Sequence, residues 1–389
     1  MDFSLTPEQQ AIRETVGRIC AEFDDNYWLE RDKSGEYPLD FHAAMAAGGW
    51  LGVAMPEEYG GAGLGVVEAA LVMHTVAGSS GAMGAASSIH LNIFGPNPIV
   101  VFGTQEQQAR WLPDLIHGRV KSCFAVTEPD AGLDTTNIRT RAVRDGDHYV
   151  VHGRKIWTSS AQVADKFLLL ARTTPRDEGA KRSDGISLFF TDLDRGGAVE
   201  VREIDKMGRK AVDSNELFID GLRVPVEDRI GEEGRGFEYI LHSLNPERVL
   251  VGIEAVAIGQ NAIARAAKYA GERIVFGRPI GQNQAVQHPL AESWMELEAA
   301  WLMAMHGAAL YDAGEPCNLQ ANAAKYLGAE AGFKACTRAV MALGGMGYAK
   351  EFHVERLLRE VMICRLAPVS PQLILCHIAE RALGLPKSY

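Results

Sequence analysis

Apolar residues recur every three to four positions in the first part of the chain, from about Asp2 to Lys121. Ile12, Val16, Ile19 and Phe23 show this spacing, which is typical of one face of an amphipathic helix. Thr6 followed by Pro7 predicts the start of that helix, because threonine caps a helix well and proline suits its first turn. Glycine- and proline-rich segments at 48–65 and 94–98 predict breaks between helices. We therefore expect an all-α domain over residues 1–121.

The pattern changes to a period of two between residues 122 and 232. Segments such as HYVVHG, KFLLLAR, GISLFF and NELFIDGLRVP are rich in Val, Ile, Leu and Phe and are separated by Asp, Gly and Arg turns. No helical segment intervenes, which favours antiparallel pairing over parallel pairing. The sequence therefore predicts a central antiparallel β domain, barrel-like or sandwich-like, over residues 122–232.

Helical periodicity returns in the last part of the chain, residues 233–389. The segment GEEGRGF predicts the turn from sheet to helix, and Asn245-Pro246-Glu247-Arg248 is interpreted as the N-cap and first turn of a long helix reaching Tyr269. Two further long helices are expected at about 285–311 and 319–343. The prediction is a C-terminal four-helix bundle, and the whole chain is an α+β multidomain protein.

Composition excludes several classes of function. The 389 residues are 47% hydrophobic, which is ample for a folded core, and a net charge of −11 with a pI near 5.5 argues against nucleic acid as a partner. The six cysteines form no C-x-x-C pair and no cluster with histidine, so we expect reduced, buried thiols and no metal site. The N-terminal residues do not resemble a signal peptide, and no apolar run reaches about 18 residues. We expect a cytoplasmic protein without a membrane span.

Two neighbouring segments carry the candidate chemistry. In FAVTEPDAGLDTT, residues 124–136, a strand end precedes a Pro-Asp-Gly turn that directs backbone N–H groups outward, which suits an anionic or carbonyl-rich ligand. In KIWTSSA, residues 155–161, Trp157 supplies a flat apolar face beside three hydroxyl residues, which suits a planar heterocycle. The alternative for both segments is purely structural, an edge strand and a serine-rich turn. The glycines at 60–65 fit no phosphate-binding motif, since neither G-x-G-x-x-G nor G-x-x-x-x-G-K-[ST] occurs in the chain.

These segments resemble the acyl-CoA dehydrogenase family over essentially the whole chain. FAVTEPDAGLDTT is similar to the flavin loop of that family and KIWTSSA to its flavin-stacking strand. KMGRKAVDSNELFIDGLRVP is similar to the segment that closes its β domain, and ERIVFGRPIGQNQAVQ, ALGGMGY and VERLLREVMI to its C-terminal signatures. The resemblance implies a helical domain, a β domain and a four-helix domain, assembled as a homotetramer (a dimer of dimers) with one FAD per protomer.

The resemblance also implies positions that contact FAD. Thr127 would donate to a flavin carbonyl, while Trp157 and Ser159 would cover the ring and reach its N5 side. Arg273, Phe276 and Gln284 would hold the diphosphate and adenosine of the FAD bound to a neighbouring protomer, although an isolated arginine is more often a surface ion pair. The other implied cofactor contacts are Phe124, Val126, Gly132, Leu133, Thr158, Met341, Gly344, Gly345, Ser370 and Gln372. At Leu133 and Met341 many members of the family carry Ser and Gln.

The largest departure concerns the catalytic carboxylate. Many members carry it in a Tyr-Glu-Gly-Thr run, where this chain has Ala367-Pro368-Val369-Ser370, so Pro368 replaces both the glutamate and a backbone N–H donor. A smaller set of members, including the isovaleryl-CoA and long-chain acyl-CoA dehydrogenases, keeps its base in a Glu-Arg pair on the first long C-terminal helix. Glu247-Arg248 matches that pair, and we interpret Glu247 as the base. The alternative is an ordinary glutamate in a helical first turn.

The implied reaction is α,β-dehydrogenation of an acyl-CoA thioester. A carboxylate would remove the Cα proton while hydride passes from Cβ to flavin N5, and electrons would go on to an electron-transfer flavoprotein. Leu133, Arg248, Pro368 and Val369 would contact the substrate. Three alternatives remain open at this point: a flavin oxidase or monooxygenase on the same fold, a non-catalytic subunit of a hetero-oligomer, and a CoA-binding module without flavin.

Overall fold

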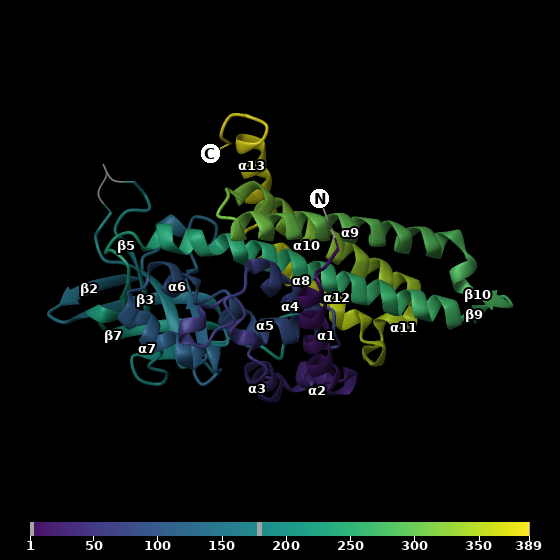
Figure 1. Cartoon of the computed structure of the whole chain (residues 1–389), viewed down its shortest axis with the longest axis horizontal. Coiled ribbons are helices and arrows are strands. Elements are labelled where there is room, and N and C mark those ends of the chain that lie inside the picture. Colours follow the sequence, from purple (N-terminus) through teal and green to yellow (C-terminus); the bar gives the residue numbers. More distant parts are fainter. Residues whose placement is uncertain (1–3, 177–180, 389) are drawn as a thin grey trace.

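The computed structural model describes residues 4–176 and 181–388, and it divides into a helical part, a sheet and a bundle of long helices (Figure 1). This arrangement confirms the predicted fold class. The N-terminal helices are α1 (Pro7–Ala21), α2 (Asp25–Ser34), α3 (Leu39–Ala47), α4 (Val66–Ala77), α5 (Ala82–Ile93), α6 (Asn97–Phe102) and α7 (Gln105–Ile116). Helix α1 begins at Pro7 as predicted, because the Thr6 hydroxyl accepts from the Gln9 backbone at 3.2 Å and the Gln9 side chain accepts from the Thr6 N–H at 3.1 Å.

The sheet has eight strands in the order β6-β7-β3-β2-β4-β5-β8, with β1 on the side of β4. The strands are β1 (Ser122–Ala125), β2 (Arg141–Asp145), β3 (His148–Ser159), β4 (Lys166–Arg172), β5 (Ile186–Asp192), β6 (Val199–Glu203), β7 (Ser214–Pro225) and β8 (Arg229–Ile230). Most pairs are antiparallel as predicted, but β4 pairs in parallel with β1 and, at one register position, with β2. Parallel pairing is feasible here because the chain makes a long connection before it returns as β4.

Four long helices form the C-terminal bundle: α8 (Gly236–Glu272), α9 (Gln284–Asp312), α10 (Asn318–Leu343) and α12 (Val354–Leu366). Short elements join or follow them: the hairpin strands β9 (Ile274–Val275) and β10 (Arg278–Pro279), α11 (Gly345–Tyr348) and α13 (Pro371–Arg381). Helices α9 and α10 occupy the predicted positions. Helix α8 is long and apolar enough to cross a membrane, but 78% of its most apolar window is buried inside the protein, as expected for a core helix.

The predicted start of the first long helix at Asn245 is wrong. Helix α8 begins at Gly236, and Pro246 lies inside it. The first turns are held because Tyr239 and Ile240 are buried in the same apolar cluster as Leu188 of β5. Packing against the sheet thus outweighs the backbone hydrogen bond that Pro246 cannot donate. Glu247 is therefore an interior residue of α8, and a first-turn glutamate is excluded.

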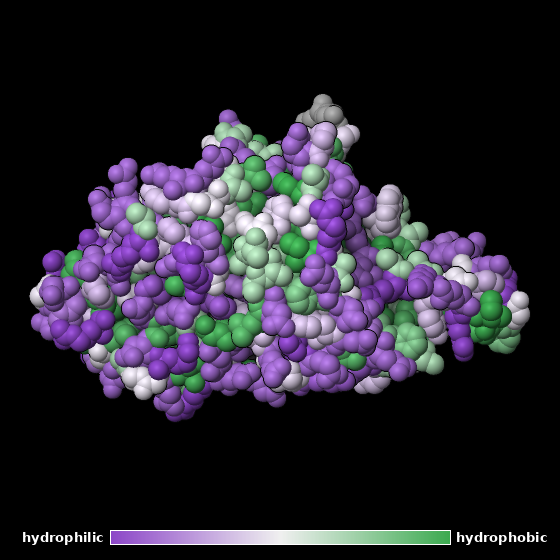
Figure 2. Space-filling view, turned by 60° about the horizontal axis from the view of Figure 1, so that its bottom comes forward, coloured by the Kyte–Doolittle hydropathy of each residue, from purple (hydrophilic) through white to green (hydrophobic). Residues whose placement is uncertain are grey.

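The surface is mostly hydrophilic, with apolar side chains in a band across the middle of one face and at the end that carries β9 and β10 (Figure 2). At that end Ile274 is 55% exposed and Phe276 is fully exposed. All six cysteines are free; five are buried, whereas Cys376 on α13 is partly exposed, which corrects the expectation that every thiol is buried.

Candidate active site

Helix α8 carries Glu247 into the interior between the bundle and the N-terminal helices. Among the described residues, the Oε2 atom of Glu247 is buried and has no hydrogen-bond partner. Burial raises the pKa of this carboxyl to about 7; the nearby charges of His90 and Arg248 oppose the shift, and that of Glu254 adds to it. A carboxylate of this kind can accept a proton near neutral pH, because its conjugate acid is much weaker than an exposed glutamic acid.

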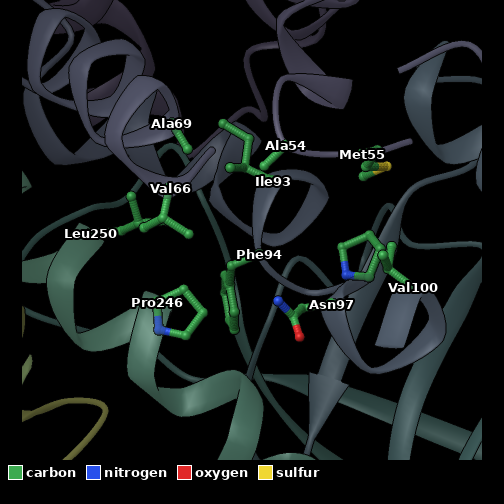
Figure 3. A pocket seen from close by; sticks show the side chains of 11 residues that line it. Ala54, Met55, Val66, Ala69, Ile93, Phe94, Asn97, Val100, Pro246 and Leu250 are labelled. Atoms are coloured by element: carbon green, nitrogen blue, oxygen red, sulfur yellow. The ribbon is translucent and has the colours of Figure 1, made fainter. Parts of the chain in front are cut away.

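A small pocket of about 40 Å³ lies against this part of α8 (Figure 3), and Glu247 itself is not among its lining residues. Helix α8 contributes Pro246 and Leu250 to its wall, on either side of Glu247 in the sequence, and α5 and the residue after it contribute Ile93 and Phe94. The other lining residues are Ala54, Met55, Val66, Ala69, Pro96, Asn97 and Val100. Asn97 is the one side chain among them with hydrogen-bonding groups, and it is bonded to Tyr311 and Ser243. The wall therefore suits an alkyl or other apolar chain.

The segment after β1 is anchored by a buried ion pair that the sequence analysis did not identify. Lys155 on β3 is fully buried, and its Nζ lies 2.9 Å from Oε1 of Glu128 and 3.0 Å from the Val126 carbonyl oxygen. Burial lowers the pKa of Lys155 to about 8, and the charge of Glu128 opposes that shift. Glu128 also accepts backbone N–H bonds from Arg139 and Thr140. Glu128 belongs to the motif FAVTEPDAGLDTT and Lys155 to KIWTSSA. Their opposite charges are the sequence signal from which this ion pair could have been predicted.

The anchored segment runs beside the end of β3. The Ile156 N–H donates to the Thr127 carbonyl oxygen at 2.9 Å, which joins the two motifs. Trp157 has a positive φ of 62° and is 56% exposed, so its ring faces outward. Thr158 is fully buried, and among the described residues its hydroxyl oxygen has no hydrogen-bond partner. The exposed aromatic face of Trp157 fits a flat heterocycle, as a flavin requires, whereas the Thr158 hydroxyl is buried within the protein.

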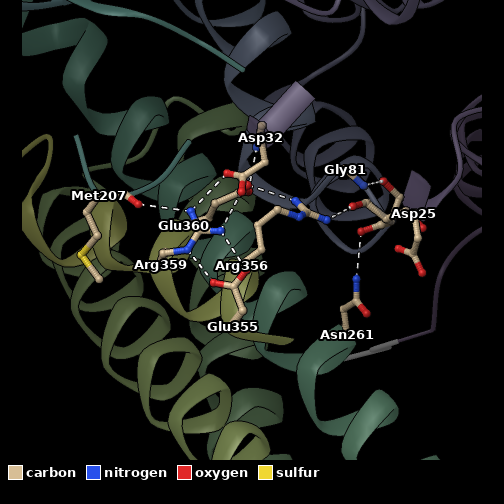
Figure 4. Close-up of polar contacts among 12 residues, drawn as sticks. Asp25, Asp32, Gly81, Met207, Asn261, Glu355, Arg356, Arg359 and Glu360 are labelled. Carbon is tan, nitrogen blue, oxygen red and sulfur yellow. Dashed lines mark hydrogen bonds and ion pairs between the residues drawn. The ribbon is translucent and has the colours of Figure 1, made fainter. Parts of the chain in front are cut away.

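Ser159, the last residue of β3, accepts a hydrogen bond at 3.0 Å from Arg209. Arg209 also donates to Ser87 on α5 and Ser214 on β7, so it ties the three parts of the chain together behind the motif. Arg209 lies in the segment KMGRKAVDSNELFIDGLRVP, but no residue spacing in that segment predicts its contacts. Near it, the Met207 carbonyl accepts from Arg359 of α12, which also pairs with Asp32 of α2 and holds this loop against the helices (Figure 4).

The remaining positions near the first motif are open to solvent. Gly132 and Leu133 are exposed, Leu133 by 65%, and no atom lies within 4 Å of the place where a Cβ on Gly132 would stand. Phe124, Val126 and Thr127 are partly buried beneath them. The exposed and partly buried residues of 124–133 and 157–159 lie together at one edge of the β domain, joined by the hydrogen bond from Ile156 to Thr127.

A second group of predicted cofactor residues lies far from that edge. Arg273, Phe276 and Gln284 are exposed at the β9–β10 end of the molecule, beyond the C-terminus of α8, whereas the β domain packs at its N-terminus (Figure 1). Met341 is 76% exposed at the end of α10, and a Cβ at Gly344 or Gly345 would meet nothing within 4 Å. Helix α8 has 37 residues and is thus about 55 Å long. The structure does not bring the two groups together within one chain.

The turn between α12 and α13 lies near the part of α8 that carries Glu247 and Arg248. Pro368 follows Ala367 through a cis peptide bond, and Val369 and Ser370 are partly buried. Ser370 caps α13 by accepting from the Leu373 N–H at 3.3 Å, and Gln372 is exposed in the first turn. Burial lowers the pKa of His377 on α13, and the nearby charge of Arg248 lowers it further, which indicates that the buried Arg248 faces this helix.

Asn245 is a candidate that sequence reasoning missed. Its Oδ1 is buried and has no hydrogen-bond partner among the described residues, so it is an acceptor free for a ligand. The asparagine was noticed in the sequence, but it was interpreted as a helix N-cap because Pro246 follows it. No group of three or more His, Cys, Asp or Glu suited to a metal ion occurs in residues 4–176 and 181–388.

Comparison with known proteins accounts for this arrangement. Three family models match: acyl-CoA dehydrogenase N-terminal domain over residues 6–119, middle domain over 123–222 and C-terminal domain over 234–382. The chain is 35% identical to acyl-CoA dehydrogenase FadE12 of Mycobacterium tuberculosis, covering 100% of this chain and 99% of the relative. Butyryl-CoA dehydrogenase from Megasphaera elsdenii superimposes with a TM-score of 0.93 at 29% identity, covering 99% and 100% of the two chains. The FAD complex of PigA superimposes with a TM-score of 0.92 at 26% identity and the same coverage.

Proposed function

The chain belongs to the acyl-CoA dehydrogenase family, and we propose that it introduces an α,β double bond into an acyl-CoA thioester with Glu247 as the catalytic base. It is an FAD-dependent oxidoreductase that acts on acyl-CoA. The exposed ring of Trp157 fits one face of the flavin.

The observation that carries the proposal is the buried, unpaired Oε2 of Glu247 together with a pKa raised to about 7. A buried carboxylate without a partner is costly and persists where function requires it. The alternative position for the base holds Pro368, which has no acidic side chain. Glu247 is thus the carboxylate that this chain offers for proton abstraction.

In the proposed reaction Glu247 removes the proton from Cα of the substrate. Burial of its Oε2 atom keeps the carboxylate basic enough to accept a proton from a weak carbon acid. FAD held at the edge around Trp157 would supply the acceptor for the hydride that leaves Cβ. Arg248, the next residue of α8, would donate to an oxygen of the substrate, since the one hydrogen bond described for it goes from Nε to the Leu244 carbonyl oxygen. The free Oδ1 of Asn245 would accept from an N–H or O–H group of the substrate.

The apolar lining of the small pocket on this part of α8 supports an apolar acyl group as the part of the substrate that packs there. Pro246, Leu250 and Phe94 would contact it, and all three lie at the pocket wall (Figure 3).

We also propose a homotetrameric assembly in which one FAD contacts two protomers. The separation of the two groups of cofactor residues along α8 supports it, as does the exposed apolar group at the β9–β10 end (Figure 2). Electrons would leave to an electron-transfer flavoprotein. The free cysteines support a reducing, cytoplasmic location.

The test is anaerobic bleaching of bound FAD by a panel of acyl-CoA thioesters, with wild-type protein and the Glu247→Gln variant. The amide has the size of the carboxylate but cannot accept a proton, so we expect at least about a 10²-fold slower bleaching with FAD and acyl-CoA binding retained. Glu238→Gln, an exposed residue on the same helix paired with Arg235, is the control and should bleach normally.

Three results would change the proposal. Normal bleaching by Glu247→Gln would place the base elsewhere. A wild type that no acyl-CoA bleaches would favour a non-catalytic subunit. Bleaching followed by rapid reoxidation in air would favour an oxidase or monooxygenase.

A further inference from the structure

A buried imidazole–carboxylate pair lies in the interior, and neither residue has a role in the reaction proposed for Glu247. Nδ1 of His90 on α5 is 2.6 Å from Oε1 of Glu254 on α8. His90 is 8% exposed and Glu254 is fully buried. Such pairs add little net stability compared with apolar residues of similar size, because both charges lose their hydration. Stability alone therefore does not explain why this pair is buried.

The pair is aligned with the base. Glu254 follows Glu247 by seven residues, about two turns, so both side chains project from the same face of α8. The ring of His90 packs on Phe94 with 4.6 Å between centroids, and Phe94 lines the same pocket as Pro246 (Figure 3). The charges of His90 and Glu254 both act on Glu247, so the imidazole and the second carboxylate lie near the proposed base.

The charges around the three groups come from several elements. Arg248 of α8 lies on one side of Glu247, and Arg209, from the loop before β7, faces His90 and Glu254. Asp213 and Glu360 of α12 offset the charge of Arg209. Burial would lower the pKa of His90, but the charge of Glu254 and the hydrogen bond to it raise that pKa overall. An imidazolium facing a carboxylate would carry no net charge as a pair.

We propose that His90 and Glu254 are positioning residues for Glu247, in which the positive charge of His90 cancels the negative charge that Glu254 would otherwise exert on the base. This inference rests on the proposed function of Glu247. Glu254, through its hydrogen bond, keeps His90 charged and fixes its ring, and His90 keeps Glu247 able to ionise at neutral pH. Two carboxylates on one helix face could not both be ionised there without a cation between them.

The consequence is an ordered set of pH shifts. Removing only the cation, in His90→Gln, leaves the Glu254 carboxylate uncompensated and should raise the pKa of Glu247 by about one unit or more. Removing only the carboxylate, in Glu254→Gln, lets His90 become neutral, so both charges disappear and the pKa of Glu247 should stay within about half a unit of wild type. The double variant also lacks both charges and should return to the wild-type value.

The experiment uses the FAD-loaded enzyme and two readouts over a pH series. Infrared difference spectra against Glu247→Gln report protonation of the Glu247 carboxyl without turnover. Anaerobic bleaching with the best acyl-CoA reports the pH below which the base fails, and this limit should move upward in His90→Gln and return in the double variant. His74→Gln is the control, because His74 is a partly buried histidine on α4 that bonds to the neutral Gln260 at 2.8 Å.

The proposal is overturned if His90→Gln leaves both readouts unchanged, if the double variant keeps the shift, or if Glu254→Gln lowers the pKa of Glu247 by about one unit, which would mean that His90 is neutral. If His90→Gln does not fold, Glu254→Gln and the double variant decide the matter. A wrong assignment of the base is recognised separately, since Glu247→Gln would then bleach normally while the infrared titration still follows Glu247.

Discussion

At the scale of single residues, the ion pair between Lys155 and Glu128 determines where the segment around Thr127 lies. Glu128 accepts two backbone N–H bonds from the far side of the turn, at Arg139 and Thr140, while Lys155 holds both Glu128 and the Val126 carbonyl. One buried charge pair therefore joins the turn to β3, the strand that carries Trp157.

Lys155→Met should destabilise the protein by about 3–5 kcal/mol, because it leaves Glu128 buried without its cation. The turn should also loosen, so FAD should dissociate more readily. Urea unfolding and FAD titration by fluorescence measure the two effects.

The matched control is Lys166→Met on the neighbouring strand β4. Lys166 pairs with Asp192, whose side chain is 79% exposed, and exposed pairs contribute about 0–1 kcal/mol. Equal losses of stability in the two variants would contradict the role assigned to the Lys155–Glu128 pair.

At the scale of elements, α8 and α10 approach closely because small residues face each other. A Cβ at Gly252 of α8 would lie 2.6 Å from the Ala324 carbonyl oxygen of α10, and Gly259 of α8 would meet the backbone of Gly332 at 3.0 Å. This close packing fixes the height and rotation of α8, and with them the direction in which Glu247 and Glu254 project.

Gly252→Ala should be destabilising by about 1–3 kcal/mol from overpacking, which exceeds the gain of up to about 1 kcal/mol in helix propensity. It should also slow flavin bleaching, since the base would be displaced. Thermal unfolding and anaerobic kinetics are the measurements.

Gly271→Ala on the same helix serves as the comparison. Its Cβ would meet nothing within 4 Å, so the variant should be neutral or slightly stabilised. A Gly252→Ala protein as stable and active as Gly271→Ala would show that the helices can move apart freely.

At the scale of the whole molecule, the length of α8 separates two surfaces that the proposed cofactor needs together. The edge around Trp157 lies by the N-terminus of this helix and Arg273 follows its C-terminus (Figure 1). A second copy of the chain is the simplest source of the missing half, and binding of FAD and assembly would then be coupled.

Arg273→Ala should weaken FAD retention and loosen the oligomer, because a hydrogen bond to a charged group is worth roughly 1.5–3 kcal/mol. FAD titration and sedimentation velocity test this. Arg278→Ala, in the same hairpin but bonded to Asn283, is the control and should behave as wild type. Unchanged FAD affinity and an unchanged sedimentation profile in Arg273→Ala would contradict cross-protomer binding.

The order of domains, the helix start at Pro7, the strand segments and the family could be predicted from the sequence alone. These features depend on neighbouring residues: the spacing of apolar side chains, caps, and short motifs such as FAVTEPDAGLDTT and KIWTSSA. The candidate base was also found in this way, through the Glu247-Arg248 pair. The proposed domain limits at 121 and 232 remain predictions.

Tertiary structure decided what depends on residues far apart in the chain. The start of α8 at Gly236 follows from packing on β5, which local capping signals cannot reveal, so Asn245 was mistaken for a cap. The pairing of His90 with Glu254 spans 164 positions and leaves no periodic signal. The environment of Glu247 is of the same kind: the sequence supplies a carboxylate, but its burial, its unpaired oxygen and its raised pKa arise because distant helices exclude water from it.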